Sequence, residues 1–542
     1  MAALALAATP ASATIVSDPA RTYVEARAAA MSGDHARSAA LLAALAESQP
    51  DQVDLARKAL TEALGAGQMD LALSVAAKIP ADKLPTDGRL LLVVDGVKHR
   101  QLDRALGWLR AGGSNPDLSF LAPLLTAWDA ADRGDADRAI TTVEQIPANS
   151  ILAPLRSEQT ALILLKFRRA ADAEPYARQA VGAAGARESR LRLALADGFL
   201  AAGDRNRALV MVEGLDTGAA AARQRLLAGK PSGQSIDNAA EALSETLTAF
   251  AGDIARMQRG APPIGLAQIA RYADPQNVSA TALLALLLAN QDRTDEALRL
   301  LRSIQKDNAL LGQARDVEVK ILTDNKRLNE AFATASAAAN ASGASVNDLS
   351  RLGGVYDAMK RYNEAAATYG RAIALAQQQG LKSQLWPLLL LQANAFEQAD
   401  RWPETKAALQ QALAIAPDQP LLLNFMGYAK LEHHEDLDNA EGMIRRASQL
   451  APDDASITDS LGWAQFKRGK LIEAIATLQK AAEKDPDQPD IQEHLGDALY
   501  KSGRRMEARF AWNAALITAE DEVAARVKAK LASGLTPANA AP

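Results

Sequence analysis

The chain contains no cysteine, and aromatic residues make up only 4% of its 542 residues. The absence of cysteine excludes disulfides, thiolate zinc sites, iron–sulfur clusters and cysteine nucleophiles. Hydrophobic residues still reach 48%, so the apolar content is mostly Ala and Leu, which favour helices over sheets. No segment is apolar over the roughly 18 residues that a bilayer requires, so we expect no integral membrane span.

The charge balance and the motifs argue against two large classes of function. A net charge of −5 leaves no basic surplus to neutralise phosphates, which predicts that the chain does not bind nucleic acid. The sequence contains no phosphate-binding glycine loop, no Gly-x-Ser-x-Gly and no His-Glu-x-x-His. The cluster at residues 433–436 (HHED) has a metal-like composition, but adjacent side chains splay apart, so we interpret it as a solvated turn. We therefore expect no enzyme activity, no catalytic residue, no cofactor and no metal.

The first residues resemble the end of an export signal. Residues 1–20 are Ala-rich and apolar, and Ala11-Ser12-Ala13 fits the small-x-small pattern before a cleavage site. No basic residue precedes Arg21, which a start codon placed too far downstream explains. We interpret 1–20 as a signal-peptide remnant and leader, which predicts a periplasmic or otherwise exported protein. The alternative is a disordered Ala-rich end on a cytoplasmic protein.

A period of 34 residues organises the chain. Residues 455–488 align without gaps on residues 489–522, with small residues over small residues and apolar over apolar. Small residues let two helices approach closely, and a proline after the second helix ends it before the next unit. The structural repeat positions that we assign are Gly353, Ala365, Gly427, Ala440, Gly462, Ala474, Pro486, Gly496 and Ala508.

This pattern resembles the tetratricopeptide repeat (TPR), which has Leu-Gly at positions 7 and 8, Ala at 20 and 27, an apolar residue at 24 and Pro at 32. The residue of position 20 recurs at spacings of 33 to 35 residues from Ala39 to Ala208, from a substituted slot at Pro263 to Ala365, and from a substituted slot at Thr405 to Ala508. About fourteen units result. The resemblance implies an all-α, tetratricopeptide-like helical-repeat solenoid, a right-handed superhelix of antiparallel helix pairs.

The period also predicts the domain organisation. A degenerate N-terminal array covers 21–216, a hinge or linker 217–240, and a C-terminal array 241–520. The linker contains one short helix and then a Gly- and Ser-rich run at 229–235 that we expect to be flexible. We predict a capping helix followed by a disordered tail at 521–542, with Val523, Val527 and Leu531 on one face of that helix.

The resemblance also implies a binding groove, because the first helix of each unit lines the concave face. In the last three units the positions that usually meet a ligand hold aromatic residues, which are good anchors, and carboxylates, which select Lys or Arg. The predicted partner-binding groove consists of Asn424, Tyr428, Asp459, Trp463, Phe466, Lys467, Asp490, Glu493, Asp497, Tyr500 and Lys501. The alternative is that the aromatics pack between helices and the carboxylates are a solvated face. Some relatives clamp a chaperone's C-terminal carboxylate here, and one amide with two acids at Asn424, Asp459 and Glu493 disfavours that role.

The expected function follows from these points. The chain is predicted to be a non-catalytic protein–protein interaction scaffold that binds one or more proteins or peptide segments through the concave groove. Export places it in envelope assembly, secretion or polysaccharide export. The alternatives are a cytosolic TPR regulator or chaperone adaptor, and a docking subunit of an enzyme complex.

Overall fold

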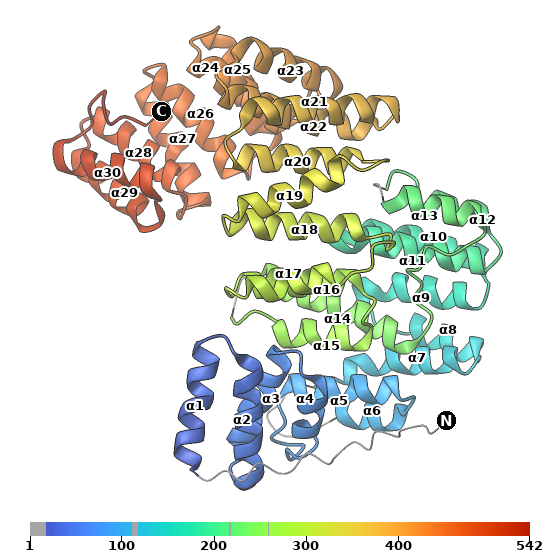
Figure 1. Cartoon of the computed structure of the whole chain (residues 1–542). Helices are drawn as coiled ribbons and strands as arrows, with labels where there is room; N and C mark the ends of the chain where they lie inside the picture. The colour runs from blue at the N-terminus through green and yellow to red at the C-terminus, as the bar shows by residue number, and fades with distance from the viewer. Residues whose placement is uncertain (1–17, 111–116, 216–217, 258–259, 542) are drawn as a thin grey trace, which may run out of the picture. The chain divides into compact units, whose positions relative to one another are not determined.

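The computed structural model describes residues 18–110, 117–215, 218–257 and 260–541, which form 30 α-helices and no strand (Figure 1). The predicted leader lies mostly outside these residues. The chain divides into two compact units, the first ending at Arg351 and the second beginning at Leu352. The division falls within α20 (Val346–Ala358), so the expected hinge at 217–240 lies inside the first unit. None of the described helices combines the length and the hydrophobicity needed to cross a membrane.

Consecutive helices form antiparallel pairs, and six pairs precede the single helix α13 (Gly218–Leu227). These pairs are α1 (Pro19–Met31) with α2 (His35–Ser48), α3 (Val53–Gly65) with α4 (Met69–Ala76), α5 (Thr86–Lys98) with α6 (Leu102–Leu109), α7 (Ala122–Asp132) with α8 (Ala136–Glu144), α9 (Arg156–Lys166) with α10 (Ala170–Ala183), and α11 (Glu188–Ala201) with α12 (Arg205–Met211). Short 3-10 turns precede α7, α9 and α11, at Ser119–Leu121, Ala153–Leu155 and Gly185–Arg187.

Eight further pairs follow α13, and a last helix closes the array. They are α14 (Ala239–Arg256) with α15 (Ile264–Ala273), α16 (Val278–Ala289) with α17 (Thr294–Arg302), α18 (Leu311–Asp324) with α19 (Leu328–Ala339), α20 with α21 (Tyr362–Gln378), α22 (Lys382–Gln398) with α23 (Trp402–Ile415), α24 (Pro420–Glu432) with α25 (Leu437–Leu450), α26 (Ala455–Lys467) with α27 (Leu471–Lys484), and α28 (Pro489–Lys501) with α29 (Arg505–Thr518), before α30 (Asp521–Ser533). The described residues thus hold fourteen pairs, which confirms the predicted all-α helical-repeat solenoid.

The recurring alanine holds the two helices of each pair together. It lies near the start of the second helix, and it is 0% exposed at Ala39, Ala72, Ala105, Ala139, Ala173, Ala208, Ala297, Ala331, Ala365, Ala440, Ala474 and Ala508. In the later units a glycine of the first helix faces the second helix. A Cβ atom added to Gly462 would lie 2.6 Å from Leu478 Cγ, and one on Gly427 would lie 2.6 Å from Ile444 Cγ1. The period of 34 therefore marks the points of closest helix approach.

The turn inside each pair has its own regularity. In most pairs one residue of this turn has a left-handed backbone, and in seven of them it is not glycine. These seven residues, with φ between 52° and 59°, are Arg100, Arg168, Asp292, Lys326, Lys360, Asp400 and His434. A side chain in this conformation costs roughly 1–2 kcal/mol. The helix pairing therefore imposes the same turn geometry even where the sequence does not favour it.

The inner face of the first array is filled by the chain itself. The first helices of its pairs line this face, and α14 and α15 pack against α3, α5 and α7. Lys98 on α5 donates to the carbonyl of Tyr272 (2.5 Å) and lies 3.8 Å from the centre of its ring. The amide of Ala239 donates to Asp132 on α7 (3.2 Å). The face that a partner would use in this array is thus occupied.

The linker between the arrays is held in place, which corrects the expectation of a flexible run at 229–235. The short helix expected there is α13, and the segment after it passes over α11. The carboxylate of Asp197 on α11 accepts from the amides of Ser232 (2.5 Å), Gly233 (3.1 Å) and Gln234 (3.0 Å). The Gly- and Ser-rich composition favours a flexible segment, but the buried carboxylate of Asp197 accepts hydrogen bonds from the backbone amides of the linker.

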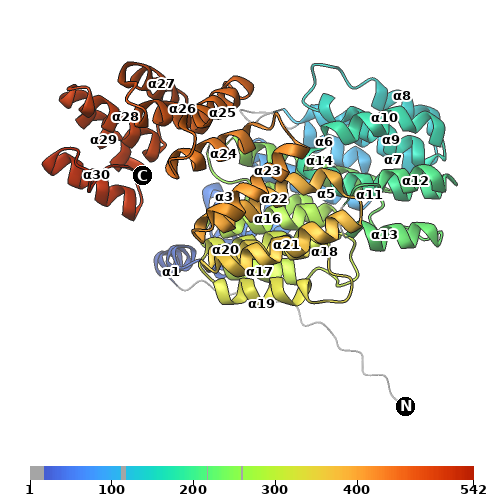
Figure 2. The same cartoon turned by 90° about the horizontal axis from the view of Figure 1, so that it is seen from above.

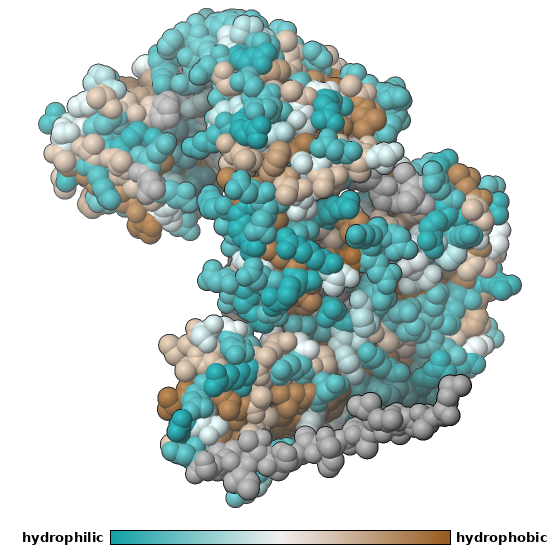
Figure 3. Space-filling model, viewed as in Figure 1, coloured by the Kyte–Doolittle hydropathy of each residue, from teal (hydrophilic) through white to brown (hydrophobic). Residues whose placement is uncertain are grey.

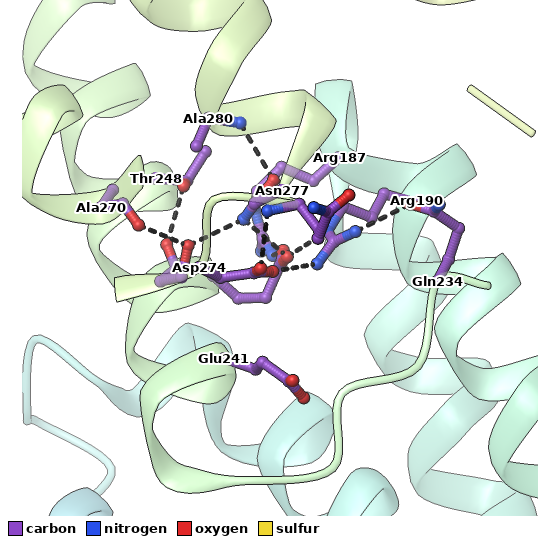
Figure 4. A network of polar contacts seen from close by, with 12 residues as sticks. Arg187, Arg190, Gln234, Glu241, Thr248, Ala270, Asp274, Asn277 and Ala280 are labelled. Atoms are coloured by element: carbon purple, nitrogen blue, oxygen red, sulfur yellow. Dashed lines mark hydrogen bonds and ion pairs between the residues drawn. The ribbon is translucent and has the colours of Figure 1, made fainter. Parts of the chain in front are cut away.

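A buried ionic network fastens α14 and α15 to the first array (Figure 4). Arg190 on α11 is 2% exposed, and it donates to Glu245, to Gln234 Oε1 (2.8 Å) and to Asp274 Oδ2 (3.0 Å). Burial lowers the pKa of Arg190, but the carboxylates of Glu245 and Asp274 outweigh burial and raise it. One guanidinium therefore joins α11, the linker, α14 and the end of α15.

Gly462→Ala should destabilise the second unit by about 1–3 kcal/mol, because the added methyl overlaps Leu478. The matched control is Gly442→Ala, since Gly442 lies exposed in α25 with no atom within 4 Å of its added Cβ. This control should gain roughly 0.5–1 kcal/mol from lower backbone entropy. Thermal and urea unfolding followed by circular dichroism measure both. Equal effects of the two variants would contradict the close approach.

Arg190→Met should destabilise the first unit by about 3–5 kcal/mol, because it leaves Asp274 buried without its cation and Glu245 with only the more distant Arg187 at 3.7 Å. Proteolysis within residues 229–238 should then become faster. The control is Arg133→Met, whose ion pair with Asp129 is on the surface and whose side chain is 68% exposed. It should change stability by less than about 1 kcal/mol. A small effect of Arg190→Met would show that the network does not hold the arrays together.

Candidate functional site

The second unit has an open cavity of about 480 Å³ between α24, α26 and α28. These are first helices of their pairs, so the cavity lies on the face that the sequence predicts for binding. Four of the predicted groove residues line it: Asn424, Tyr428, Asp459 and Asp490. Phe425, Ser456, Ser460, Gln488, Ile491 and His494 complete the lining.

The cavity is acidic. Asp459 is 7% exposed; one of its oxygens lies 2.9 Å from His494 Nδ1, and the other, Oδ1, has no hydrogen-bond partner among the described residues. Burial lowers the pKa of His494, but Asp459 and the nearby carboxylates Asp497 and Glu493 outweigh it and raise the pKa. The pKa of Tyr428 is also raised, first by burial and then by acidic neighbours that include Asp459. The raised pKa values of His494 and Tyr428 both indicate a negative potential in the cavity.

The predicted aromatic strip is buried, which corrects its assignment to the binding surface. Trp463 is 0% exposed, because its ring is stacked between Phe466 (4.7 Å between centroids) and His494 (4.1 Å). Phe466 is half-buried against the core of the last repeat. Tyr500 is half-buried as well, and its ring centroid lies 5.3 Å from that of Trp512. Trp463 and Phe466 thus pack against the last repeat, and Tyr500 packs within it.

Two of the predicted carboxylates are also buried, because the last helix covers them. Glu493 and Asp497 are 0% exposed. Lys530 on α30 donates to both, at 2.6 and 2.7 Å, and Arg526 donates to Glu493 at 2.8 Å. Figure 2 shows α28, α29 and α30 side by side. On α30, Val527 is fully buried, and Val523 and Leu531 pack against the same core.

The tail after α30 is ordered through Ala541, which corrects the expectation of a disordered tail. Asn539 accepts from the amide of Thr536 (2.7 Å) and donates to the carbonyl of Gly534 (2.9 Å), so the tail turns back. The amide of Ala541 then reaches Asp497 Oδ2 (3.2 Å). The inner face of the last repeat is therefore closed by the chain's own C-terminal segment.

The predicted lysines and the histidine turn lie outside the cavity. Lys467 is exposed and pairs with Glu432 at 3.7 Å, and Lys501 is exposed. In the turn, His433 stacks on Trp402 (4.5 Å) and contacts Glu397 rather than its sequence neighbours.

Comparison with known proteins rests on the same repeats. A family model described as TPR repeat matches residues 462–503, which run from α26 to α28. The TPR repeat-containing protein PA4667 of Pseudomonas aeruginosa is 33% identical over 101 residues. This match covers 18% of the chain and 17% of the relative, so the chain spans only a small part of that protein. The chain thus contains tetratricopeptide repeats, which the family model matches at residues 462–503.

Solved structures of low identity resemble this TPR protein over longer stretches. The anaphase-promoting complex hetero-tetramer Cut9–Hcn1 is 14% identical, with 96% of the chain and 97% of the other covered and a TM-score of 0.38. A tetratricopeptide repeat protein from Parabacteroides merdae is 13% identical over 46% of the chain and 96% of its own length, with a TM-score of 0.37.

Sequence reasoning missed three residues of this TPR face. His494 lies in the first helix of its repeat, one residue after Glu493, and only Glu493 was predicted to face the groove. Arg526 and Lys530 could have been found, because the period of 34 continued past residue 520 places them beside Glu493 and Asp497. The predicted array ended at residue 520, so the ion pairs that α30 makes were not predicted.

Proposed function

We propose that this TPR protein is a non-catalytic scaffold whose second unit docks a partner protein through a segment that carries Lys or Arg. The cavity at Asn424, Tyr428 and Asp459 is the docking point. The observation that carries the proposal is the buried carboxylate of Asp459, whose Oδ1 has no partner among the described residues. An unpaired buried acceptor is unfavourable, and a cationic donor from a partner relieves that penalty.

The last repeat shows which side chains pair with carboxylates on this face of the second unit. In the last repeat Glu493 and Asp497 take Arg526 and Lys530 from α30. Asp459 stands one repeat earlier on the same face, 34 residues before Glu493, and the solvent-exposed Asp490 lies in the same cavity. A basic segment of a partner would pair with Asp459 and Asp490 in the open cavity, as α30 pairs with Glu493 and Asp497 in the last repeat.

Asp490→Asn and Asp459→Asn should each weaken binding of an Arg- and Lys-containing peptide at least about tenfold, or 1.4 kcal/mol. Arrays of such peptides probed with the full chain give the binders, and fluorescence anisotropy gives the dissociation constants. Asp490→Asn is the cleaner test, since Asp490 is exposed and the substitution keeps its shape. Binding should also weaken as salt rises.

The matched control is Asp453→Asn, an exposed carboxylate in the turn before α26 that does not line the cavity. It should leave the dissociation constant unchanged. A peptide in which every Lys and Arg is replaced by Gln should not bind. Equal binding by the Asp490 and Asp453 variants would reject the docking point.

We further propose that the protein is exported and acts in envelope assembly, secretion or polysaccharide export. The support is the Ala-rich start with Ala11-Ser12-Ala13. Cell fractionation should recover the protein from the periplasm, and N-terminal sequencing should begin near Thr14. Recovery in the cytoplasm with the N-terminus intact would instead favour a cytosolic regulator.

A further inference from the structure

The helix α29 carries a row of large apolar side chains that face solvent. Met506, Phe510 and Ile517 are 67%, 69% and 82% exposed. With Asn513 between them, they lie at i, i+4, i+7 and i+11, which places all four within about 60° of one another around the helix. Figure 3 shows hydrophobic surface, in brown, at the end of the array that α29 and α30 form. This apolar row extends over about 16 Å, or three turns of helix.

The repeat itself does not require this apolar row. The corresponding positions of the preceding second helix, α27, hold Ile472, Ala476, Gln479 and Glu483. Ile472 is 89% exposed, but small and polar side chains follow it. Single exposed apolar residues are common on protein surfaces, whereas a contiguous set of them indicates an interaction site. The apolar row belongs to a second helix and does not line the acidic cavity, which the first helices α24, α26 and α28 form.

The two ends of the apolar row carry charges of opposite sign. Residues 501–509 contain four basic side chains and one acidic one, and residues 518–522 contain three acidic side chains and no basic one. Arg505 and Arg509 at the first end and Glu520 and Glu522 at the second are exposed. None of these four forms an ion pair among the described residues. The surface is therefore complementary to an inverted copy of itself.

We propose that α29 binds α29 of a second copy of this chain, with the two helices antiparallel about a two-fold axis. This pairing places Met506 opposite Ile517 of the second copy, and Phe510 opposite Asn513 of the second copy. Asn513 tolerates this cover, because its side-chain amide already donates to the carbonyl of Arg509 (2.7 Å). The basic end of each helix then meets the acidic end of the other, whereas a parallel pairing would bring like charges together.

The size of the surface predicts a weak dimer. A single pair of helices buries less area than the roughly 1,200 Å² of a stable interface, so we expect a dissociation constant of about 10–100 µM. An anionic membrane would also accept apolar residues beside arginines, but the acidic residues at 520–522 oppose it. A second copy satisfies both ends of the apolar row.

Sedimentation velocity of the full chain from about 2 to 200 µM should show a reversible equilibrium between monomer and dimer. Phe510→Gln with Ile517→Gln should raise the dissociation constant at least tenfold. The matched control is Ile472→Gln, which removes a more exposed side chain at the repeat position of Met506 and should change nothing. Circular dichroism and thermal unfolding check that each variant is folded.

A charge exchange tests the antiparallel orientation. Arg505→Glu alone should weaken the dimer, because it places two carboxylates together at each end of the interface. Glu520→Arg added to Arg505→Glu should restore the dimer, because each end again meets an opposite charge. A double variant weaker than Arg505→Glu alone would contradict this orientation.

An introduced cysteine tests the contact directly, because the chain has none of its own. In the proposed pairing the two Asn513 residues lie about 4.5 Å apart along the axis, within reach of a disulfide. Asn513→Cys should therefore form a covalent dimer when copper phenanthroline and oxygen oxidise the two thiols. Gln479→Cys, exposed at the corresponding position of α27, should not.

Asp490→Asn should dimerise as the wild type does, so the dimer and the acidic docking point are tested separately. Four results would each overturn the dimer: a monomer up to about 200 µM, an equal effect of Ile472→Gln, equal cross-linking of both cysteine variants, or binding to phosphatidylglycerol–phosphatidylcholine vesicles that requires Phe510 without any dimer in solution.

Discussion

Close contact between the two helices of a pair, at an alanine of the second and often a glycine of the first, governs the architecture. At Gly462 there is no room for a methyl group, and at Ala474 no surface is left exposed. The small residues bring the backbones together, and large side chains of the second helix, such as Leu478 and Trp512, pack against the glycine of the first. This constraint explains why a chain with 48% hydrophobic residues has 4% aromatics. It also makes stability a sum of local contacts.

The first helices of the pairs form an inner face, and the chain covers part of that face itself. Each first helix presents a face that a partner or another part of the chain must cover. In the first array α14, α15 and the linker cover it, and in the last repeat α30 and the tail do so. In the second unit the cavity around Asp459 remains open and acidic.

Sequence reasoning predicted the local part of this structure well. The offset of 34 predicted the helix pairs and the buried alanines, because each depends on contacts within one or two units. It could also place Asp459 on the inner face. Whether that face is open depends on segments far away in the chain. No periodicity indicates that Glu245 will meet Arg190, or that Asp197 will hold a Gly- and Ser-rich linker. Trp463 was misplaced for the same reason: position in the repeat gives its face, and the stacking of His494 from the next repeat removes its exposure.

The occupied inner face of the first array sets an order of events during synthesis. The ribosome releases the N-terminus first, so α1 to α12 emerge before the residues that cover them. Until α14 and α15 follow, Arg190 lacks both Glu245 and Asp274, and the apolar surface of α5 faces water. In the second unit α30 covers the inner face of the last repeat, so this face is covered once synthesis of the chain is complete. The inner face of the first array is therefore covered only after α14 and α15 have been synthesised, and it stays exposed until then.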